Sequence, residues 1–260
     1  MMNKKLITIF MSLLLALSFG VLEQAAALSG TEILEELDNN MRADNQYMEQ
    51  EMVIVSSRGS ERSRDLAMWS KIEDDGFEYM LARFLAPADV AGTGLLLEED
   101  DMWLYLPDLG SSRRIAGSAR EGDFMGSDFS YEDMEALGTV GFAETFEAEF
   151  LTEVEFETRN AYQLKLEPHD QDNTAYNRLE MKVDTEYWLP LKIDYYEDEE
   201  LLKTLLTFNH QMIDGRWTAQ EMEMTNHQSD TKTIMKVKEV DYSSDIDPNI
   251  FTERNLERGF

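Results

Sequence analysis

The chain of 260 residues contains no cysteine. This absence excludes disulfide bonds, thiolate metal sites, a thiol nucleophile and the lipidated cysteine of a bacterial lipoprotein. The folded state must therefore be stabilised by burial of apolar side chains, and the 43% hydrophobic fraction is large enough to form a core.

Basic residues are scarce, because 23 Lys and Arg stand against 53 Asp and Glu and leave a formal charge of -30. Such a surface repels phosphate backbones and anionic headgroups. The charge therefore argues against nucleic-acid binding and against simple adsorption to an anionic membrane. A saline habitat and a basic partner would each explain this high negative charge equally well.

Motifs that mark enzymes and metal sites are also missing. The histidines His169, His210 and His227 fall on different predicted elements and lack metal-binding spacing, which predicts no bound transition metal. The stretch 169–173 has the first two ligands of a calcium loop but neither its glycine nor its distal glutamate. No Gly-x-Ser-x-Gly, Walker or dinucleotide motif occurs. We predict no cofactor and rank a carboxylate-based hydrolase third among the functions considered.

A long apolar run occurs only at the N-terminus. Lys4 and Lys5 precede an apolar run over Leu6–Leu22, and the small residues Ala25–Ala27 follow. This order is typical of a secretory signal peptide cleaved after Ala27, and the serine and glycine within the run favour it over a membrane anchor. No later segment reaches the ~20 apolar residues of a spanning helix. We therefore expect residues 28–260 to be a single soluble domain in the periplasm.

Periodicity predicts one helix followed by a sheet. Ser29 and Glu32 have capping-box spacing at the start of a helix over Ser29–Ala43. Beyond Gln46 the apolar period becomes two, most clearly over Phe142–Phe156, where glutamates alternate with apolar residues. Similar runs are Met48–Val55, Leu66–Ile72, Phe77–Leu81, Met102–Leu106, Tyr162–Leu166, Arg178–Val183, Leu189–Tyr196, Leu201–Asn209, Trp217–Asn226 and Thr231–Val240.

The breaks between these runs are short and carry turn residues, at Asp74-Asp75-Gly76, Arg159-Asn160 and Asp214-Gly215. The pattern predicts a mainly β (α+β) fold with one antiparallel sheet of roughly ten or eleven strands joined mostly by hairpins. One face of this sheet is expected to be buried and the other hydrated.

An insertion over Pro107–Gly141 interrupts the hairpins and contains a predicted helix over Tyr131–Leu137, capped by Ser130. Long insertions of this kind are often functional loops or lids. Its large apolar residues Phe124, Met125 and Phe129 form either a permanent plug at the open end of the sheet or a hinged lid.

The chain is rich in soft apolar side chains, with 16 methionines and 4 tryptophans. Methionine adapts its shape and suits a cavity that accepts flexible apolar ligands, although it also fills ordinary cores. Both interpretations remain open at this level.

Several segments together resemble the outer-membrane lipoprotein-sorting protein family, a branch of the LolA/LolB-like superfamily. The segments are Phe84–Pro87 with Gly92–Leu96, Asp101–Pro107 with Arg113–Ile115, Phe124–Asp133, Leu189–Ile193 with Leu202–Thr204, and Asp247–Thr252. The resemblance covers nearly all of residues 28–260, and the Met-Gly-Ser-Asp sequence at 125–128 is its most specific part.

The resemblance implies a half-open antiparallel β-barrel whose apolar concave face is covered by helices and loops and shields a lipid or lipoprotein acyl chain in the periplasm. It also implies a membrane transporter of the resistance-nodulation-division type as a partner. The competing hypothesis is an accessory protein that carries nothing and docks on such a transporter. Candidate ligand-binding residues are Met68, Trp103, Tyr105, Phe124, Met125, Phe129 and Trp188; no catalytic or metal-binding residue is assigned.

Overall fold

A computed structural model of the protein describes residues 28–73, 76–98, 101–138, 141–170 and 174–259. The predicted signal peptide (1–27), two residues of the predicted turn at 74–76 and residues 171–173 of the calcium-like stretch lie outside the described residues.

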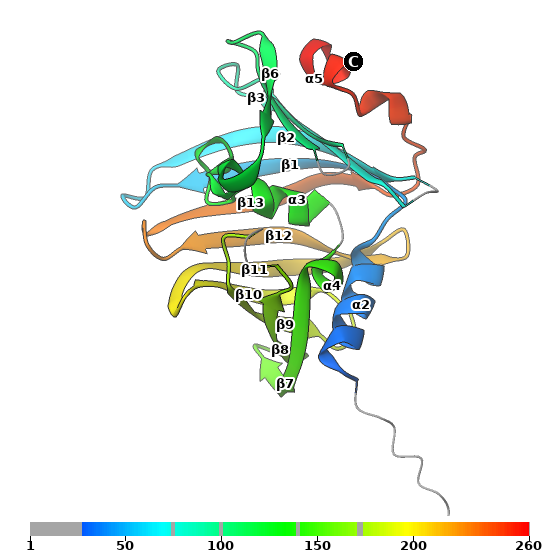
Figure 1. Ribbon diagram of the computed structural model, residues 1–260, viewed down its shortest axis with the longest axis vertical. Coiled ribbons are helices and arrows are strands. Elements are labelled where there is room, and N and C mark those ends of the chain that lie inside the picture. Colours follow the sequence, from blue (N-terminus) through cyan, green and yellow to red (C-terminus); the bar gives the residue numbers. More distant parts are fainter. Residues whose placement is uncertain (1–27, 74–75, 99–100, 139–140, 171–173, 260) are drawn as a thin grey trace, which may run out of the picture.

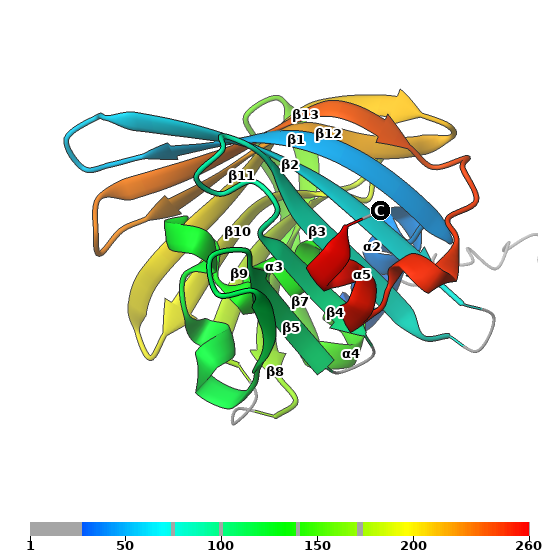
Figure 2. The same cartoon turned by 90° about the horizontal axis from the view of Figure 1, so that it is seen from above.

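Thirteen strands form one antiparallel sheet in the order β6-β5-β4-β3-β2-β1-β13-β12-β11-β10-β9-β8-β7 (Figure 1). Their bounds are β1 Asn45–Val55, β2 Glu61–Ile72, β3 Glu78–Ala86, β4 Gly94–Glu98, β5 Asp101–Leu106, β6 Ser111–Ile115, β7 Phe146–Phe156, β8 Arg159–Pro168, β9 Arg178–Asp184, β10 Pro190–Glu197, β11 Glu200–Ile213, β12 Arg216–Asn226 and β13 Thr231–Asp241. The sheet curls around a concave face while its edge strands β6 and β7 stay unpaired with each other (Figure 2). The prediction of a mainly β, half-open barrel is confirmed.

The strand count exceeds the prediction because β4 and β6 lack alternation. In β4, Leu95 and Leu97 pack in the core on the concave face, while Leu96 packs in a second cluster on the outer face. A strand buried on both faces reads as a continuous apolar run rather than an alternating one. The edge strand β6 is polar along most of its length, with a buried side chain only at Ile115.

Two predicted boundaries were wrong. Residues Phe142–Thr145 form the short helix α4, so the strand predicted from Phe142 begins at Phe146. The turn predicted at Arg159-Asn160 instead lies at residues 157–158, where Glu157 has a φ of 54°. The predicted turn at Asp214-Gly215 is confirmed, and both of its residues have positive φ as a tight hairpin requires.

The helices are α2 Gly30–Met41, α3 Tyr131–Gly138, α4 and α5 Glu253–Arg258, with 3₁₀ turns η1 Gly117–Glu121, η2 Phe124–Gly126 and η4 Pro248–Ile250. The predicted capping box of Ser29 and Glu32 begins α2, which buries Ile33, Leu34 and Leu37 against the sheet. No helix in the described part of the chain is long and apolar enough to cross a membrane.

The insertion does not sit within a single hairpin loop, because residues 107–110 form the turn between β5 and β6 and residues 111–115 form β6 itself. The chain then runs from β6 at one edge of the sheet to β7 at the other, and the described residues between these strands, 116–138 and 141–145, are here called the crossing segment. Helix α3 of this segment lies inside the curl of the sheet (Figure 2). The crossing segment therefore covers the concave face, and the helix predicted at Tyr131–Leu137 is confirmed as α3.

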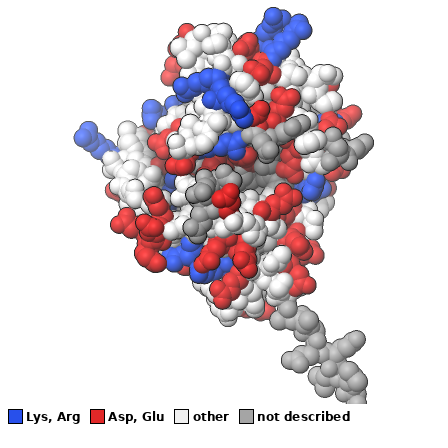
Figure 3. Space-filling model, viewed as in Figure 1, with Lys and Arg blue, Asp and Glu red and all other residues white. Residues whose placement is uncertain are grey.

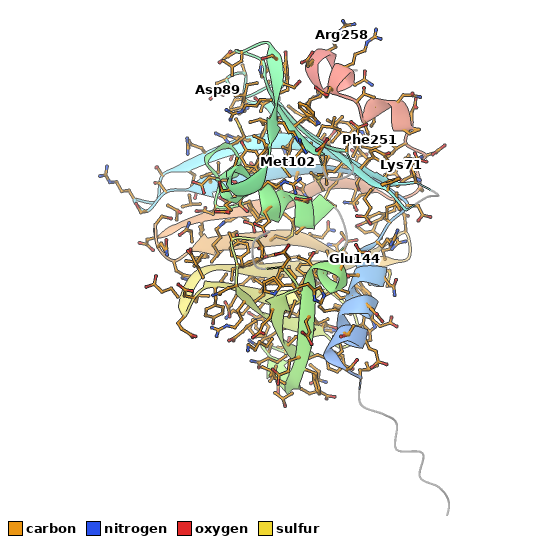
Figure 4. All side chains as sticks on the ribbon, viewed as in Figure 1. Lys71, Asp89, Met102, Glu144, Phe251 and Arg258 are labelled. Carbon is orange, nitrogen blue, oxygen red and sulfur yellow. The ribbon has the colours of Figure 1, made fainter. Side chains whose placement is uncertain are left out.

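The C-terminal residues pack on the outer face of the sheet. Ile246, Phe251 and Leu256 form a cluster with Leu81 and Leu96 of the sheet. The guanidinium of Arg83 donates to the carbonyl oxygens of Asn255 and Leu256 at 2.8 Å each, which holds the end of α5. Figure 4 labels Phe251 and Arg258 in this segment, away from the concave face.

Candidate functional site

The concave face contains a partly open cavity of about 120 Å³ between the sheet, α3 and the end of α2. Methionine is prominent in its wall, which includes Met41, Met48, Met68, Met134, Met222 and Met224. These six flexible side chains come from two helices and three strands. An apolar wall of this composition can adapt to ligands of different shape.

Helix α3 forms the cover of the cavity. Met134 and Leu137 of α3 line the covered side of the cavity, together with Phe142 of α4. At the end of α3, a Cβ added to Gly138 would lie 2.0 Å from the sulfur of Met80 on β3. The absence of a side chain at this position lets α3 pack closely on the sheet.

The beginning of α3 is fixed by buried polar contacts. Ser130 and Asp133 cap the helix reciprocally, with the Ser130 amide donating to Asp133 Oδ2 at 2.7 Å and the Asp133 amide donating to Ser130 Oγ at 3.0 Å. Asp133 also forms an ion pair with Lys203 of β11 at 3.1 Å and accepts from the Tyr176 hydroxyl at 2.9 Å. One end of the cover is thus anchored to the sheet.

The Met-Gly-Ser-Asp sequence anchors the crossing segment at a second point. Asp128 Oδ2 accepts from Thr233 Oγ1 of β13 at 2.7 Å, and the Asp128 amide donates to the same hydroxyl at 2.9 Å. Met125 and Gly126 have positive φ, which reverses the chain there. Before this reversal, the Phe124 ring stacks on Phe84 with centroids 5.5 Å apart.

The structure brings two of the predicted ligand-binding residues to the cavity, Met68 and Phe129. Phe124 and Met125 lie in the same core without lining the cavity, and Trp188 stacks on Tyr162 with centroids 5.7 Å apart. Trp103 and Tyr105 are placed elsewhere, because they pack against the cluster on the outer face.

The cavity wall also has a polar part that was not predicted from the sequence, which includes Gln46, Gln50, Ser70 and Thr207. A signal was present, since Gln46 and Gln50 flank Met48 at a spacing of two at the start of the predicted run Met48–Val55, and residues at this spacing share a face in a strand. The histidines lie apart in the chain and have different partners, His210 at Thr207 and His227 at Thr204. No group of three metal-binding side chains occurs among the described residues.

Acidic side chains lie where α2 meets α4 beside the cavity. Asp38 accepts from the amides of Ala143 at 2.9 Å and Phe142 at 3.3 Å, at the start of α4. Burial raises the pKa of Asp38 to about 6, and the charges of Glu144 and Glu78 act in the same direction. Figure 4 shows Glu144 on α4 beside α2, and Figure 3 shows acidic side chains spread over the same side of the molecule.

The raised pKa of Asp38 predicts a pH effect on stability. Since the folded-state pKa of about 6 exceeds the ordinary value of 3.8, the contribution of Asp38 is complete below about pH 4 and is lost as the pH rises through 6. We expect Asp38→Asn, which cannot ionise, to gain stability relative to the wild type as the pH rises from 4 to 7.5. Urea denaturation across this range measures the difference, and a difference that stays constant with pH would contradict the assignment.

Three solved structures share this half-open β-barrel fold. A domain described as outer membrane lipoprotein-sorting from Vibrio parahaemolyticus is 29% identical with a TM-score of 0.80, covering 88% of this chain and 98% of its own. A DUF1329 family protein from Desulfovibrio piger is 30% identical with a TM-score of 0.81, covering 87% and 97%. A LolA superfamily protein from Nitrosomonas europaea shares the fold at 19% identity and a TM-score of 0.71, covering 87% and 98%.

A family model described as that of an uncharacterized protein matches residues 76–258. No curated protein matches the chain. The protein belongs to the DUF1329 family, and the resemblance to outer-membrane lipoprotein-sorting proteins inferred from the sequence is confirmed.

Proposed function

We propose that this protein is a periplasmic carrier that shields an acyl chain of a lipid or a lipoprotein in the cavity on its concave face. The observation that carries the proposal is the methionine-rich cavity beneath α3. The family supports a sorting or carrier role, and the predicted signal peptide supports the periplasm. Two acids at or beside the cavity have structural roles, because Asp133 pairs with Lys203 and Asp38 accepts from amides at the start of α4.

The size of the cavity shows what uptake requires. Because a cavity of roughly 150 Å³ binds one benzene, a cavity of about 120 Å³ accepts only a short alkyl segment as it stands. Burial of a sixteen-carbon chain is worth on the order of 12 kcal/mol at about 0.8 kcal/mol per methylene. This gain is large enough to displace part of the cover and to repack the methionines. Release of so tightly held a chain then needs an acceptor.

The acceptor we propose is a membrane transporter of the resistance-nodulation-division type, the partner class that the family resemblance implies. An accessory protein that docks on such a transporter without carrying lipid is the alternative. The two roles differ in one measurable property, because only a carrier binds acyl chains in its cavity.

Binding of an uncharged fluorescent acyl amide tests the proposal. We expect saturable binding by the wild type and a loss of about five- to tenfold in affinity for Met222→Gln, which places a polar amide in the apolar wall. The matched control is Met212→Gln on β11, at a side chain that is 52% exposed and outside the cavity. Mass spectrometry of lipid extracted from the purified protein provides an independent readout. Absence of both probe binding and extracted lipid would overturn the carrier function.

A further inference from the structure

The cavity wall carries uncharged polar side chains along two paired strands. On β1, Gln46, Met48 and Gln50 face the cavity, and on β2, Ser70 and Met68 do so. Gln46 pairs with Ser70, and Met48 pairs with Met68 in the antiparallel register. Along the two strands, the polar pair Gln46 and Ser70 is therefore followed by the apolar pair Met48 and Met68, and then by the polar Gln50 on β1.

Gln50 is an unusual side chain for this position. It is only 3% exposed, yet among the described residues its amide nitrogen bonds only the thioether sulfur of Met48, and its amide oxygen has no hydrogen-bond partner. A thioether is a weak acceptor, so a strong donor and a strong acceptor are left at the cavity wall. Buried polar groups in proteins are normally paired, and an exception calls for an explanation.

The charged groups around the cavity give a ligand no counter-charge. Lys71 is the only lysine or arginine among the described lining residues. Its ammonium group is held by Asp245 at 3.1 Å and by the carbonyl oxygen of Ile246 at 2.8 Å, in the segment that packs on the outer face. The remaining charged lining residues, Glu78 and Asp133, are acidic. An ionised carboxylate or phosphate in this cavity would lose its hydration without gaining a cation.

We propose that the cavity selects acyl esters or amides over ionised fatty acids, with Gln50 donating to the uncharged carbonyl oxygen of the ligand and Gln46 and Ser70 binding its neighbouring polar atoms. The inference rests on the proposed carrier function and specifies the ligand class of the same cavity. The methionine pair then contacts the chain next to the carbonyl group.

Two ligands that share one acyl chain but differ in head group, together with a hydrocarbon that has no polar group, separate the head-group effect from chain burial. Glycerol monododecanoate, dodecanoate at pH 8 and hexylbenzene are compared as competitors of the fluorescent acyl amide. We expect the wild type to bind the ester at least tenfold more tightly than dodecanoate. Hexylbenzene, which has no hydrogen-bonding group, measures the apolar wall alone.

Variants at Gln50 test the assigned donor. Gln50→Leu is expected to weaken ester binding about tenfold, the size of one lost hydrogen bond, and to leave hexylbenzene binding unchanged or stronger. If the leucine variant does not fold, Gln50→Met is tested in its place, because methionine retains the flexibility and length of the glutamine side chain. Gln211→Leu on β11, exposed and outside the cavity, is the matched control and should bind every ligand like the wild type.

Two results would overturn this inference while leaving the carrier function intact. The first is dodecanoate binding as tight as that of the ester, and the second is unchanged ester binding by a folded Gln50 variant. A wild-type protein that binds none of the three ligands would instead overturn the carrier function itself.

Discussion

Replacing Phe124 by alanine is expected to lower the free energy of unfolding by about 3–5 kcal/mol, the range for deleting a fully buried phenylalanine. The Phe124 side chain is 1% exposed and lies between Phe84 and Tyr131, with ring centroids 5.5 and 5.6 Å away. Its removal leaves a cavity that these neighbours cannot easily fill, because they belong to a strand and to an anchored helix. Urea denaturation followed by tryptophan fluorescence measures the change.

The adjacent Met125 is the control for this prediction. Met125 is only partly buried, and its backbone has a φ of 54° whichever side chain it bears. We therefore expect Met125→Ala to lower stability by about 1 kcal/mol or less, in the range of ordinary single substitutions.

The two variants also separate a plug from a lid. The contacts of Phe124 and the bonds of Asp128 to β13 favour a permanent plug, in which Phe124→Ala is strongly destabilising and uptake of the acyl probe is little changed. A small loss of stability with a clearly altered uptake rate would instead show that this part of the crossing segment moves when ligand enters.

Replacing Lys203 by methionine is expected to lower the free energy of unfolding by about 3–5 kcal/mol, because it leaves the Asp133 carboxylate without its cation. The side chains of Lys203 and Asp133 are 11% and 3% exposed, and the two groups lie 3.1 Å apart. Lys203 also lies 3.2 Å from the Tyr176 hydroxyl. Thermal and urea denaturation should agree on the loss.

A double variant tests whether the unpaired Asp133 carboxylate causes the stability loss of Lys203→Met. Asp133→Asn combined with Lys203→Met removes both charges, and we expect it to recover most of the stability lost by Lys203→Met alone. The exposed ion pair of Arg114 and Asp101 provides the contrast, since Arg114→Met should cost less than about 1 kcal/mol. If the double variant were as unstable as the single one, packing of the lysine stem rather than charge would be responsible.

Local patterns predicted the parts of the fold that local physics determines. The capping box placed α2, the Ser130 cap placed α3, and the alternating glutamates of β7 placed a strand with one hydrated face. The strand β4 was not predicted, because its three leucines are buried on both faces of the sheet. Such a strand lacks the alternation of apolar and polar residues on which the prediction depends.

The residues of the candidate site were harder to predict, because both faces of β5 carry apolar side chains. Met102 and Leu104 belong to the core on the concave face, while Trp103 and Tyr105 are covered by the C-terminal segment on the outer face. A period of two shows that Met102 and Leu104 face the opposite side of the sheet from Trp103 and Tyr105. It does not show which of these two pairs lies on the concave face. The path of the crossing segment from edge to edge also depends on the curl of the whole sheet, which no local pattern encodes.

The pairing of β1 with β13 has a consequence for how the chain folds. Strands β1 to β6 and strands β7 to β13 can each form by successive hairpins, but the two halves join where Tyr47 meets Asp241. Because pairing between segments so distant in sequence is slow, β1 keeps an unpaired edge until β13, the last strand of the chain, has formed. Such an edge can pair with other chains. Closure of the β1–β13 seam should therefore be a late step of folding, at which concentration-dependent aggregation competes with formation of the native state.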